Sequence, residues 1–426
     1  MFSAPSLKSV LKKKMQTPVC FVLFFVKPLS LLISTGTVSF RIRAPRHPAQ
    51  NRHLGLLQIN QDMRPAILVI SNPVSGDRNG CQFVEENVLP LFRIQDLPYE
   101  LEETRGVGAA GSLALQFLQK HENESNVALV LVISGGDGTV HEVVNGIGIP
   151  SRAIQLVLCP QGTANALYST LFPPSNDGLS TLEYRTKSLR AFLDGRSRPL
   201  MLAETKLITT DGQVTRTLLG VVVTSTALHA SILDSAEHLR TSISGIERFQ
   251  VAAMENRSNW YQSHVRLYPS VPGGTVQTYD PSVGAFKRLN PSRQSEVDLH
   301  GPFAYFLSTV NVDRLEPNFE TSPLFVKLPP GPGEMDLIVI RPLRDPSLEL
   351  DMPESRAAFT QKLFAVLQEA YNHGNHLALR YHEDGSVTSA GNGPYVVEYF
   401  RCGGWEWVPV RIIQPISAVP TKTPFF

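Results

Sequence analysis

The chain has 426 residues, of which 42% are hydrophobic, so it is long enough for two packed domains and too apolar to be disordered. Nine of its 39 lysines and arginines precede the first acidic residue, Asp62, which leaves 30 basic against 38 acidic residues in the remainder. A body with a net charge of about −8 repels phosphate backbones, which excludes general nucleic-acid binding unless a basic face is concentrated somewhere.

The four cysteines lie far apart in the sequence, at Cys20, Cys81, Cys159 and Cys402. They lack the close pairing of a zinc site or a disulfide framework, so we expect a reduced, intracellular body. Beyond residue 61 no apolar run approaches the roughly 18 residues that would span a bilayer. We therefore expect a cytoplasmic protein whose association with membranes is peripheral.

Residues 1–62 form a basic and apolar extension that we expect to be separate from the folded body. The basic stretch up to Lys14, followed by the apolar residues 19–26, resembles the first two regions of a signal peptide, although Lys27-Pro28 interrupts it. The lack of acidic residues before Asp62 also fits a mitochondrial or other organelle-targeting peptide. A true translation start at Met63 would leave the same sequence upstream, and composition alone weighs these three origins equally.

The first elements after this extension alternate between strands and helices. The predicted strands are 66–70, 99–104, 127–133 and 154–158, and the predicted helices are 81–92, 112–119 and 140–145. Such alternation predicts a parallel sheet, and the uninterrupted apolar run 127–133 is typical of a strand that is buried on both faces.

Three of these strands end in small or polar residues. The first runs into Asn72-Pro73, the third into Gly135-Gly136-Asp137-Gly138-Thr139, and the fourth into Pro160-Gln161-Gly162-Thr163-Ala164-Asn165. In open α/β sheets the ligand binds at the edge formed by the carboxyl ends of the strands. We therefore expect a binding site where these three turns meet.

Beyond about Arg198 the sequence changes to longer β-like runs, at 218–223, 303–310 and 336–340, separated by loops rich in proline and glycine. One helix is expected at 353–371, where an apolar stripe indicates core packing. We predict an α/β nucleotide-binding domain at 63–198, a β-rich domain at 199–415 and a tail at 416–426.

The Gly135–Thr139 turn is suited to binding an anion. Without side chains its backbone N–H groups can approach a phosphate closely, and the helix that follows directs its positive dipole end there. A carboxylate at Asp137 would repel a nucleotide unless it binds Mg²⁺ or accepts a proton from an attacking hydroxyl. The alternatives are a tight turn that needs glycine for its geometry alone, and a helix-capping role for Asp137.

Two other motifs in this region do not predict function. Residues 106–111 spell GxGxxG, but they follow the second strand rather than the first, and the acid expected about twenty residues later is missing. His141-Glu142 would begin a zinc-protease motif, but Asn145 occupies the place of the second histidine. The chain also lacks the G-x-x-x-x-G-K-[ST] motif of P-loop proteins.

The chain resembles the diacylglycerol kinase catalytic family, and within it the sphingosine kinase branch. The resemblance rests on three ordered blocks, Asn72-Pro73-Val74-Ser75-Gly76, the segment from Gly135 to Gly146, and Pro160-Gln161-Gly162-Thr163-Ala164-Asn165-Ala166-Leu167. It runs from about Pro65 to Val410 and is thinner after Arg198. It implies a Rossmann-like parallel sheet of the NAD-kinase and diacylglycerol-kinase type, followed by a C-terminal β-sandwich domain.

The resemblance also implies roles for individual residues. Asp137 would be the catalytic proton acceptor, and Asp234 would meet the lipid head group. The residues implied to contact ATP are Asn72, Pro73, Thr104, Arg105, Gly135, Gly136, Gly138, Thr139, Glu142, Gly162, Thr163, Asn165, Arg240, Arg248, Asn392 and Gly393.

Three positions depart from the family pattern. Ala164 stands where the family usually repeats a glycine, and its methyl group would crowd the approach of a phosphate. Asn392-Gly393 has the spacing of a C-terminal Asp-Gly but lacks the acid, which Asp384-Gly385 carries at a different distance. Asp234 is offset by one position from the acid of the family.

The expected function is that of a lipid kinase which uses ATP and Mg²⁺ to phosphorylate the primary hydroxyl of a sphingoid long-chain base at a membrane surface. A diacylglycerol or ceramide kinase is the alternative within the same chemistry. A nucleotide- or lipid-binding regulator that has lost catalysis, and a soluble NAD kinase, are the alternatives from other classes. The sequence does not determine the oligomeric state.

Overall fold

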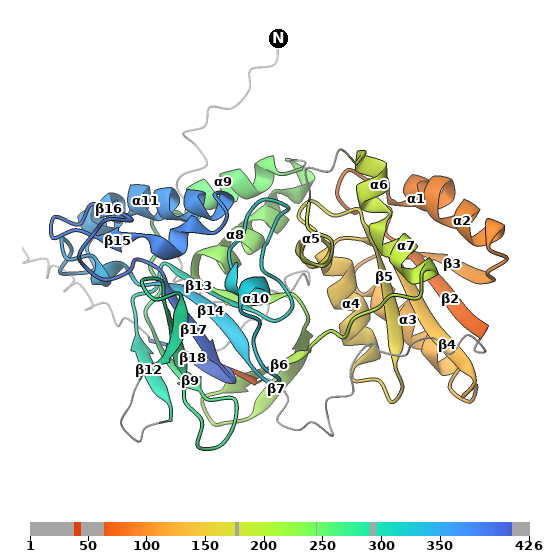
Figure 1. Cartoon of the computed structure of the whole chain (residues 1–426), viewed down its shortest axis with the longest axis horizontal. Coiled ribbons are helices and arrows are strands. Elements are labelled where there is room, and N and C mark those ends of the chain that lie inside the picture. The colour runs from red at the N-terminus through yellow and green to blue at the C-terminus, as the bar shows by residue number, and fades with distance from the viewer. Residues whose placement is uncertain (1–37, 44–63, 175–178, 244, 290–294, 411–426) are drawn as a thin grey trace, which may run out of the picture.

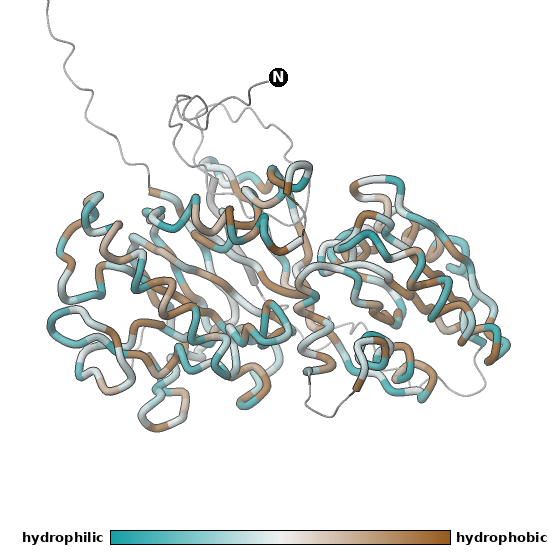
Figure 2. Tube along the Cα trace, turned by 90° about the horizontal axis from the view of Figure 1, so that it is seen from above, coloured by the Kyte–Doolittle hydropathy of each residue, from teal (hydrophilic) through white to brown (hydrophobic). Residues whose placement is uncertain are grey.

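The computed structural model describes residues 38–43, 64–174, 179–243, 245–289 and 295–410. These residues form two lobes, an α/β domain and a β-rich domain, that meet along a narrow waist (Figures 1 and 2). The predicted tail 416–426 and most of the predicted extension 1–62 lie outside the described residues. Among the helices of the described residues, none is long and apolar enough to cross a membrane.

The α/β domain contains a four-stranded parallel sheet in the order β3-β2-β4-β5. Its elements are β2 (Arg64–Ser71), α1 (Gly80–Phe83), a π-helical turn (Val84–Val88), α2 (Leu89–Ile94), β3 (Tyr99–Glu103), α3 (Ala109–Lys120), β4 (Val127–Gly135), α4 (Asp137–Ile147), β5 (Ile154–Pro160), α5 (Ala166–Leu171), α6 (Thr181–Arg185) and α7 (Lys187–Leu193). The parallel sheet and its alternation with helices are as predicted.

Alternate residues of the central strand β4 are buried on opposite faces of the sheet. Leu131 and Ile133 pack in a core with residues of α3 and α4, whereas Val130 and Val132 belong to a second core that includes residues of α1, α2 and α7. Covering both faces explains why this strand is continuously apolar in sequence. It also leaves the carboxyl edge of the sheet as the place where polar loops can gather.

The β-rich domain is a sandwich of two six-stranded antiparallel sheets, as predicted. The strand orders are β12-β9-β18-β1-β6-β7 and β11-β10-β17-β14-β13-β8. The strands are β1 (Val38–Arg43), β6 (Ala203–Thr209), β7 (Val214–Gly220), β8 (Val223–Thr226), β9 (Ser263–Tyr268), β10 (Gln277–Asp280), β11 (Ala285–Arg288), β12 (Val297–His300), β13 (Tyr305–Thr309), β14 (Met335–Ile340), β17 (Glu398–Cys402) and β18 (Gly404–Pro409), and β15 (Arg380–Tyr381) pairs separately with β16 (Val387–Thr388).

Aromatic side chains fill the space between the two sheets. The rings of Trp405 and Trp407 lie 4.8 and 5.2 Å from that of Phe306, and none of the three side chains is exposed to solvent. Burial of such large rings is a major stabilising term in a two-sheet core.

Helices cover the outer face of the second sheet, where the core includes residues of α8, α11, β13 and β14. The helical elements of this domain are α8 (Ala227–His238), a 3₁₀ turn (Leu239–Thr241), α9 (Glu247–Asn256), α10 (Leu324–Lys327), a 3₁₀ turn (Pro342–Arg344), α11 (Pro353–Gln368) and two further 3₁₀ turns (Glu369–Tyr371 and Asn375–Ala378). The apolar stripe predicted on the helix after residue 353 is buried there through Phe359, Leu363 and Val366.

Residues 38–43, which we expected to belong to a separate extension, form strand β1 inside the sandwich. This strand pairs antiparallel with β18 on one side and with β6 on the other. A chain starting at Met63 would lack β1, which would leave backbone N–H and C=O groups of both neighbours without their partners. The sequence does not reveal this strand, because the basic composition of the extension carries no sign of the distant strands β6 and β18 with which residues 38–43 pair.

Two truncations test whether β1 belongs to the folded body. Removing residues 1–62 should make the protein insoluble or lower its unfolding temperature by at least about 5 °C, because two strand ladders are lost. Removing only residues 1–37 keeps every described element and should leave the unfolding temperature within about 2 °C. Equal unfolding temperatures for the two truncated proteins, measured by scanning calorimetry, would contradict the assignment.

Candidate functional site

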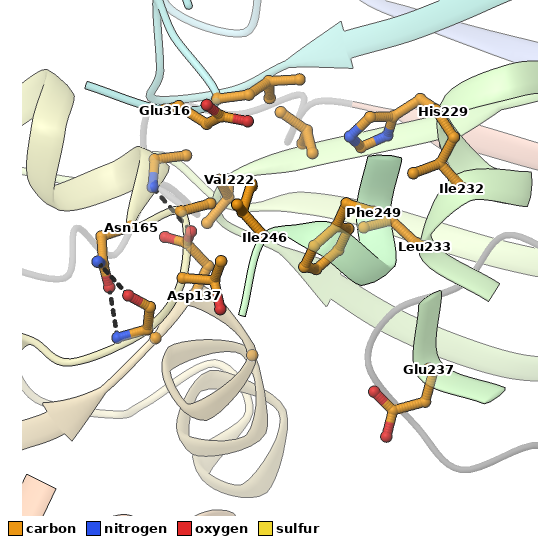
Figure 3. Close-up of a pocket in the computed structure, with 18 of the residues that line it drawn as sticks. Asp137, Asn165, Val222, His229, Ile232, Leu233, Glu237, Ile246, Phe249 and Glu316 are labelled. Atoms are coloured by element: carbon orange, nitrogen blue, oxygen red, sulfur yellow. Dashed lines mark hydrogen bonds between the residues drawn. The ribbon is translucent and has the colours of Figure 1, made fainter. Parts of the chain in front are cut away.

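A cavity of about 480 Å³ lies between the two domains. One wall consists of the loops that follow β2, β4 and β5, together with the start of α4. The opposite wall consists of residues from α8, α9 and α11 and from the loops beside β7 and β13. Figure 3 shows side chains of both walls converging on the same space.

The three strand-end loops pack against one another through their backbones. A Cβ atom at Gly162 would lie 2.5 Å from the Cα of Gly136, and a Cβ atom at Gly76 would lie 2.2 Å from the carbonyl oxygen of Gln161. Gly76 also has a φ of +50°, a conformation that favours glycine. These glycines are therefore required for the loops to meet, quite apart from any contact with a ligand.

Two asparagines hold these loops in position. Asn72 donates from Nδ2 to Oγ1 of Thr139 at 2.9 Å, and its Oδ1 accepts from the backbone of Val74 at 3.1 Å. Asn165, in the left-handed conformation with a φ of +57°, exchanges two hydrogen bonds with the backbone of Gly162. The amide side chains thus bind the loops internally and present their outer edges to the cavity.

Asp137 lies at the first position of α4, but its side chain caps a different helix. Its Oδ2 accepts from the backbone N–H of Ala166 at 2.7 Å and its Oδ1 from that of Leu167 at 3.1 Å, at the start of α5. Burial raises the pKa of Asp137 above the ordinary value, and these two N–H groups offset part of that rise. Each oxygen keeps a further lone pair that can accept a proton or a hydrogen bond. The capping role and a catalytic role are compatible.

Glu142, one turn further along α4, caps α3 in the same way. Burial raises its pKa, while hydrogen bonds from the backbone of Gly108 and Ala110 lower it. This contact uses the backbone of Gly108, the second glycine of the GxGxxG pattern, and close packing accounts for the third, Gly111. A Cβ atom at Gly111 would lie 2.5 Å from the carbonyl oxygen of Glu142 and 3.1 Å from the Cα of Gly146. Gly111 thus allows α3 and α4 to pack closely.

Asn145 joins the two domains. Its Nδ2 donates to the carbonyl of Leu219 in β7 and its Oδ1 accepts from the N–H of the same residue, both at 2.9 Å. Burial, with a contribution from Arg216, lowers the pKa of the adjacent His141 to about 4, so this imidazole is neutral at physiological pH. Asn145, which occupies the position of a metal ligand in zinc proteases, here orients α4 against the β-rich domain.

Two arginines from the β-rich domain line the cavity. Arg240 donates to the backbone carbonyl of Val74 at 3.0 Å and lies 3.3 Å from Glu237. Burial and the nearby Arg240 lower the pKa of Arg248. Its buried Nε has no hydrogen-bond partner in the described part of the chain. Two neighbouring cations with a single carboxylate paired to one of them favour the binding of an anion.

The rest of the cavity is largely apolar. Figure 3 shows Ile232 and Leu233 of α8 facing Phe249 of α9, with His229 above them. His229 pairs with the hydroxyl of Ser225 at 2.7 Å, and burial lowers its pKa to about 4. A neutral imidazole among aliphatic and aromatic side chains leaves this end of the cavity suited to a hydrocarbon chain.

Most of the residues predicted for the site line this cavity. They are Asn72, Gly136, Asp137, Gly138, Thr139, Glu142, Gly162, Thr163, Asn165, Asp234, Arg240 and Arg248. Ala164, which the sequence resemblance marked as a departure, also lines it.

The remaining predicted residues do not line the cavity. Pro73 and Gly135 adjoin lining residues in sequence. Thr104 and Arg105 follow β3, where the N–H of Thr104 bonds to the carbonyl of Ser71 and thereby extends the sheet. Asn392 and Gly393 follow β16 in the sequence, and Arg380 of β15 bonds to their carbonyls. Figure 1 shows β15 and β16 at the far end of the β-rich lobe from the α/β domain. The assignment of Asn392 and Gly393 to the ATP site is not supported by this arrangement.

Several lining residues were not expected from the sequence. Ser75 and Gly76 belong to the Asn-Pro block and could have been included on that ground. His229, Glu316 and Tyr371 come from the β-rich domain, and nothing in their local sequence indicates that they face a cavity.

Comparison with known proteins shows that residues 66–204 match the model of the diacylglycerol kinase catalytic domain. Diacylglycerol kinases from two Staphylococcus aureus strains, bovine RF122 / ET3-1 and MRSA252, are each 35% identical to this chain over 123 residues. The alignments cover 28% of this chain and 36% of each relative, so the chain spans about a third of their length. A crystal structure of a diacylglycerol kinase from Bacillus anthracis str. Sterne has 16% identity and a TM-score of 0.36, covering 66% of this chain and 74% of that one.

A pair of glycine substitutions tests the packing of the loops. Gly162→Ala should destabilise the protein by about 1–3 kcal/mol, because its methyl group meets backbone atoms. Gly106→Ala is the matched control, since a Cβ atom there would meet nothing within 4 Å. It should stay within about 0.5 kcal/mol of the wild type. Urea unfolding gives the free energy of both variants, and equal effects of the two changes would contradict the packing role of Gly162.

The contact between the domains is tested at Asn145. Asn145→Ala leaves the N–H and C=O of Leu219 without their partners and should lower the free energy of unfolding by about 1–3 kcal/mol. Asn87→Ala removes one bond, at 3.2 Å, to a carbonyl four residues earlier, and it serves as the control with an effect below about 0.5 kcal/mol. A loss at Asn145 no greater than that at Asn87, measured by urea unfolding, would contradict the assigned role.

Proposed function

Because residues 66–204 match the model of the diacylglycerol kinase catalytic domain, we propose that the chain is an ATP-dependent lipid kinase. The observation that carries this proposal is the composition of the cavity. Its α/β wall has glycine-rich turns, a helix N-terminus and a carboxylate, whereas the facing wall combines two arginines with an apolar surface. One wall suits a polyphosphate and the other suits a lipid that enters the same space.

In this proposal Asp137 accepts the proton of the lipid hydroxyl. The hydroxyl oxygen forms a bond to the γ-phosphorus of ATP, the bond from that phosphorus to the bridging oxygen breaks, and ADP leaves. Arg240 and Arg248 offset the negative charge on the transferred group, which is the main way in which proteins assist this reaction. The raised pKa of Asp137 makes it a stronger base than an ordinary carboxylate.

Magnesium is best treated as part of the substrate. The described residues contain no group of three or more His, Cys, Asp or Glu side chains that could hold a metal ion. Mg²⁺ commonly binds through one or two carboxylates together with phosphate oxygens and water, so an ion that arrives with ATP needs no such group. Asp137 is such a carboxylate on the α/β wall of the cavity, and its remaining lone pairs are free to bind an ion that arrives with ATP.

The proposed lipid is a sphingoid long-chain base presented at a membrane surface. This choice is supported by the apolar wall of α8 and α9, which suits a hydrocarbon chain. It also follows the resemblance of the chain to the sphingosine kinase branch, which rests on the three sequence blocks in the α/β domain. A diacylglycerol or ceramide kinase remains the alternative within the same chemistry.

The test is phosphate transfer from labelled ATP to a panel of sphingosine, ceramide, diacylglycerol and monoacylglycerol. We expect the fastest transfer to sphingosine and a loss of at least about a hundredfold with Asp137→Asn, which keeps the size of the side chain but is a poor base. ATP binding measured on the same variant serves as the control, because a damaged fold would lose both. Transfer to none of the lipids, or undiminished transfer by the variant, would refute the proposal.

A further inference from the structure

The carboxylates that line the cavity differ in how their charge is compensated. Five of them are present, and four have evident partners among the described residues. Asp137 and Glu142 each accept two backbone N–H groups at the start of a helix. Glu237 lies 3.3 Å from Arg240, and Asp234 lies 3.7 Å from the imidazole of His238. The fifth carboxylate, Glu316, has no such compensation.

Glu316 accepts one hydrogen bond, from the hydroxyl of Tyr371 to its Oε2 at 3.1 Å. No cation lies within 4.0 Å of it in the part of the chain that the structure describes, although nearby Glu320 pairs with both Arg314 and His373. Burial raises the pKa of Glu316. A half-buried carboxylate without a positive partner is costly, and its cost falls when a cation binds beside it.

Arg248 provides the opposite case in the same cavity. It forms no ion pair within 4.0 Å among the described residues, and its Nε lacks a hydrogen-bond partner. Among the described residues the cavity thus holds one cation and one anion without an ion-pair partner, both contributed by the β-rich domain. A phosphate of ATP would satisfy the arginine, so the second ligand is the one expected to satisfy Glu316.

We propose that Glu316 binds the ammonium group of a long-chain amine and thereby selects a cationic lipid over neutral ones. The inference rests on the proposed lipid kinase function and identifies the side chain that reads the head group. In a sphingoid base the ammonium group is on the carbon adjacent to the one that bears the primary hydroxyl. One head group can therefore contact Asp137 through its hydroxyl and Glu316 through its ammonium group. Diacylglycerol and ceramide have no cation at that position and would leave Glu316 uncompensated.

The arrangement of the cavity supports this assignment. In Figure 3, Glu316 and Asp137 project from opposite domains on one side of the pocket, and Ile232 and Phe249 lie on the other side. A lipid with its hydroxyl at Asp137 would place its hydrocarbon chain along that apolar side. Asp234, the acid expected to contact the head group, has a side chain that is 39% exposed and already lies beside His238. It is therefore less suited than Glu316 to hold a cation away from water.

Equilibrium binding tests the proposal without requiring turnover. The full chain is titrated with sphinganine and with N-acetylsphinganine in matched detergent micelles, since the two lipids share the chain and the hydroxyl but only the first is charged. We expect sphinganine to bind at least about tenfold more tightly than its N-acetyl derivative. Equal affinities for the two lipids would overturn the proposal.

The variant for this test is Glu316→Gln, whose amide oxygen can still accept the hydrogen bond from Tyr371. It should weaken sphinganine binding by about tenfold and leave N-acetylsphinganine within about twofold. Glu320→Gln is the matched control in the same loop and should preserve the preference for sphinganine. Parallel losses for both lipids in Glu316→Gln, or the same effect in Glu320→Gln, would show a merely structural role and overturn the proposal.

Phosphate transfer in the same samples separates this inference from the proposed function. A wild-type protein that prefers sphinganine through Glu316 but phosphorylates no lipid would support the binding assignment and refute the kinase. A protein that phosphorylates lipids and binds sphinganine and N-acetylsphinganine equally would support the kinase and refute the binding assignment of Glu316.

Discussion

The candidate site depends on the close contact between three loops at the carboxyl edge of the parallel sheet. Gly136 and Gly162 approach so closely that a methyl group on either would meet the backbone of the other loop. Gly76 lies in a similar contact with Gln161. Since the strands are buried on both faces, their ends cannot shift independently. This constraint fixes the position of Asp137, whose carboxylate is then held by the first turn of α5.

The β-rich domain completes the site from the other side, and polar contacts between the domains keep the two walls in register. Asn145 bonds to the backbone of β7, and Arg240 reaches the carbonyl of Val74 in the loop after β2. Thr170 of α5 and Asp313 bond to each other through side chain and backbone. Each of these contacts joins the α/β domain to the β-rich domain. The charged side chains of the cavity are thus brought together by residues of both domains.

The sequence indicated which residues of the α/β domain gather at the carboxyl edge of the sheet because its signals there are local. A buried parallel strand is a continuous apolar run, and it ends where Gly or Asn appears, so the sequence pattern alone places the three loops on one edge of the sheet. The prediction extended to Asp137, Asn72 and Gly162, which all line the cavity.

The β-rich half was predicted less well because its contacts are distant in sequence. Strand β1 pairs with strands that are more than 150 residues away in the sequence, so its local sequence gives no sign that it belongs to a sheet. Asn392 and Gly393 were placed by spacing alone, and Gly393 instead packs against the backbone of Tyr381. Glu316 stands in an unremarkable Leu-Glu-Pro segment, and only the three-dimensional arrangement shows that it lacks a cation.

The most direct test of this account is a structure of the protein with a non-hydrolysable ATP analogue and sphinganine bound together. The account predicts the phosphates at the turns 135–139 and 161–165 and beside Arg248, with the lipid hydroxyl at the carboxylate of Asp137. A nucleotide bound elsewhere, or a lipid hydroxyl remote from Asp137, would contradict it.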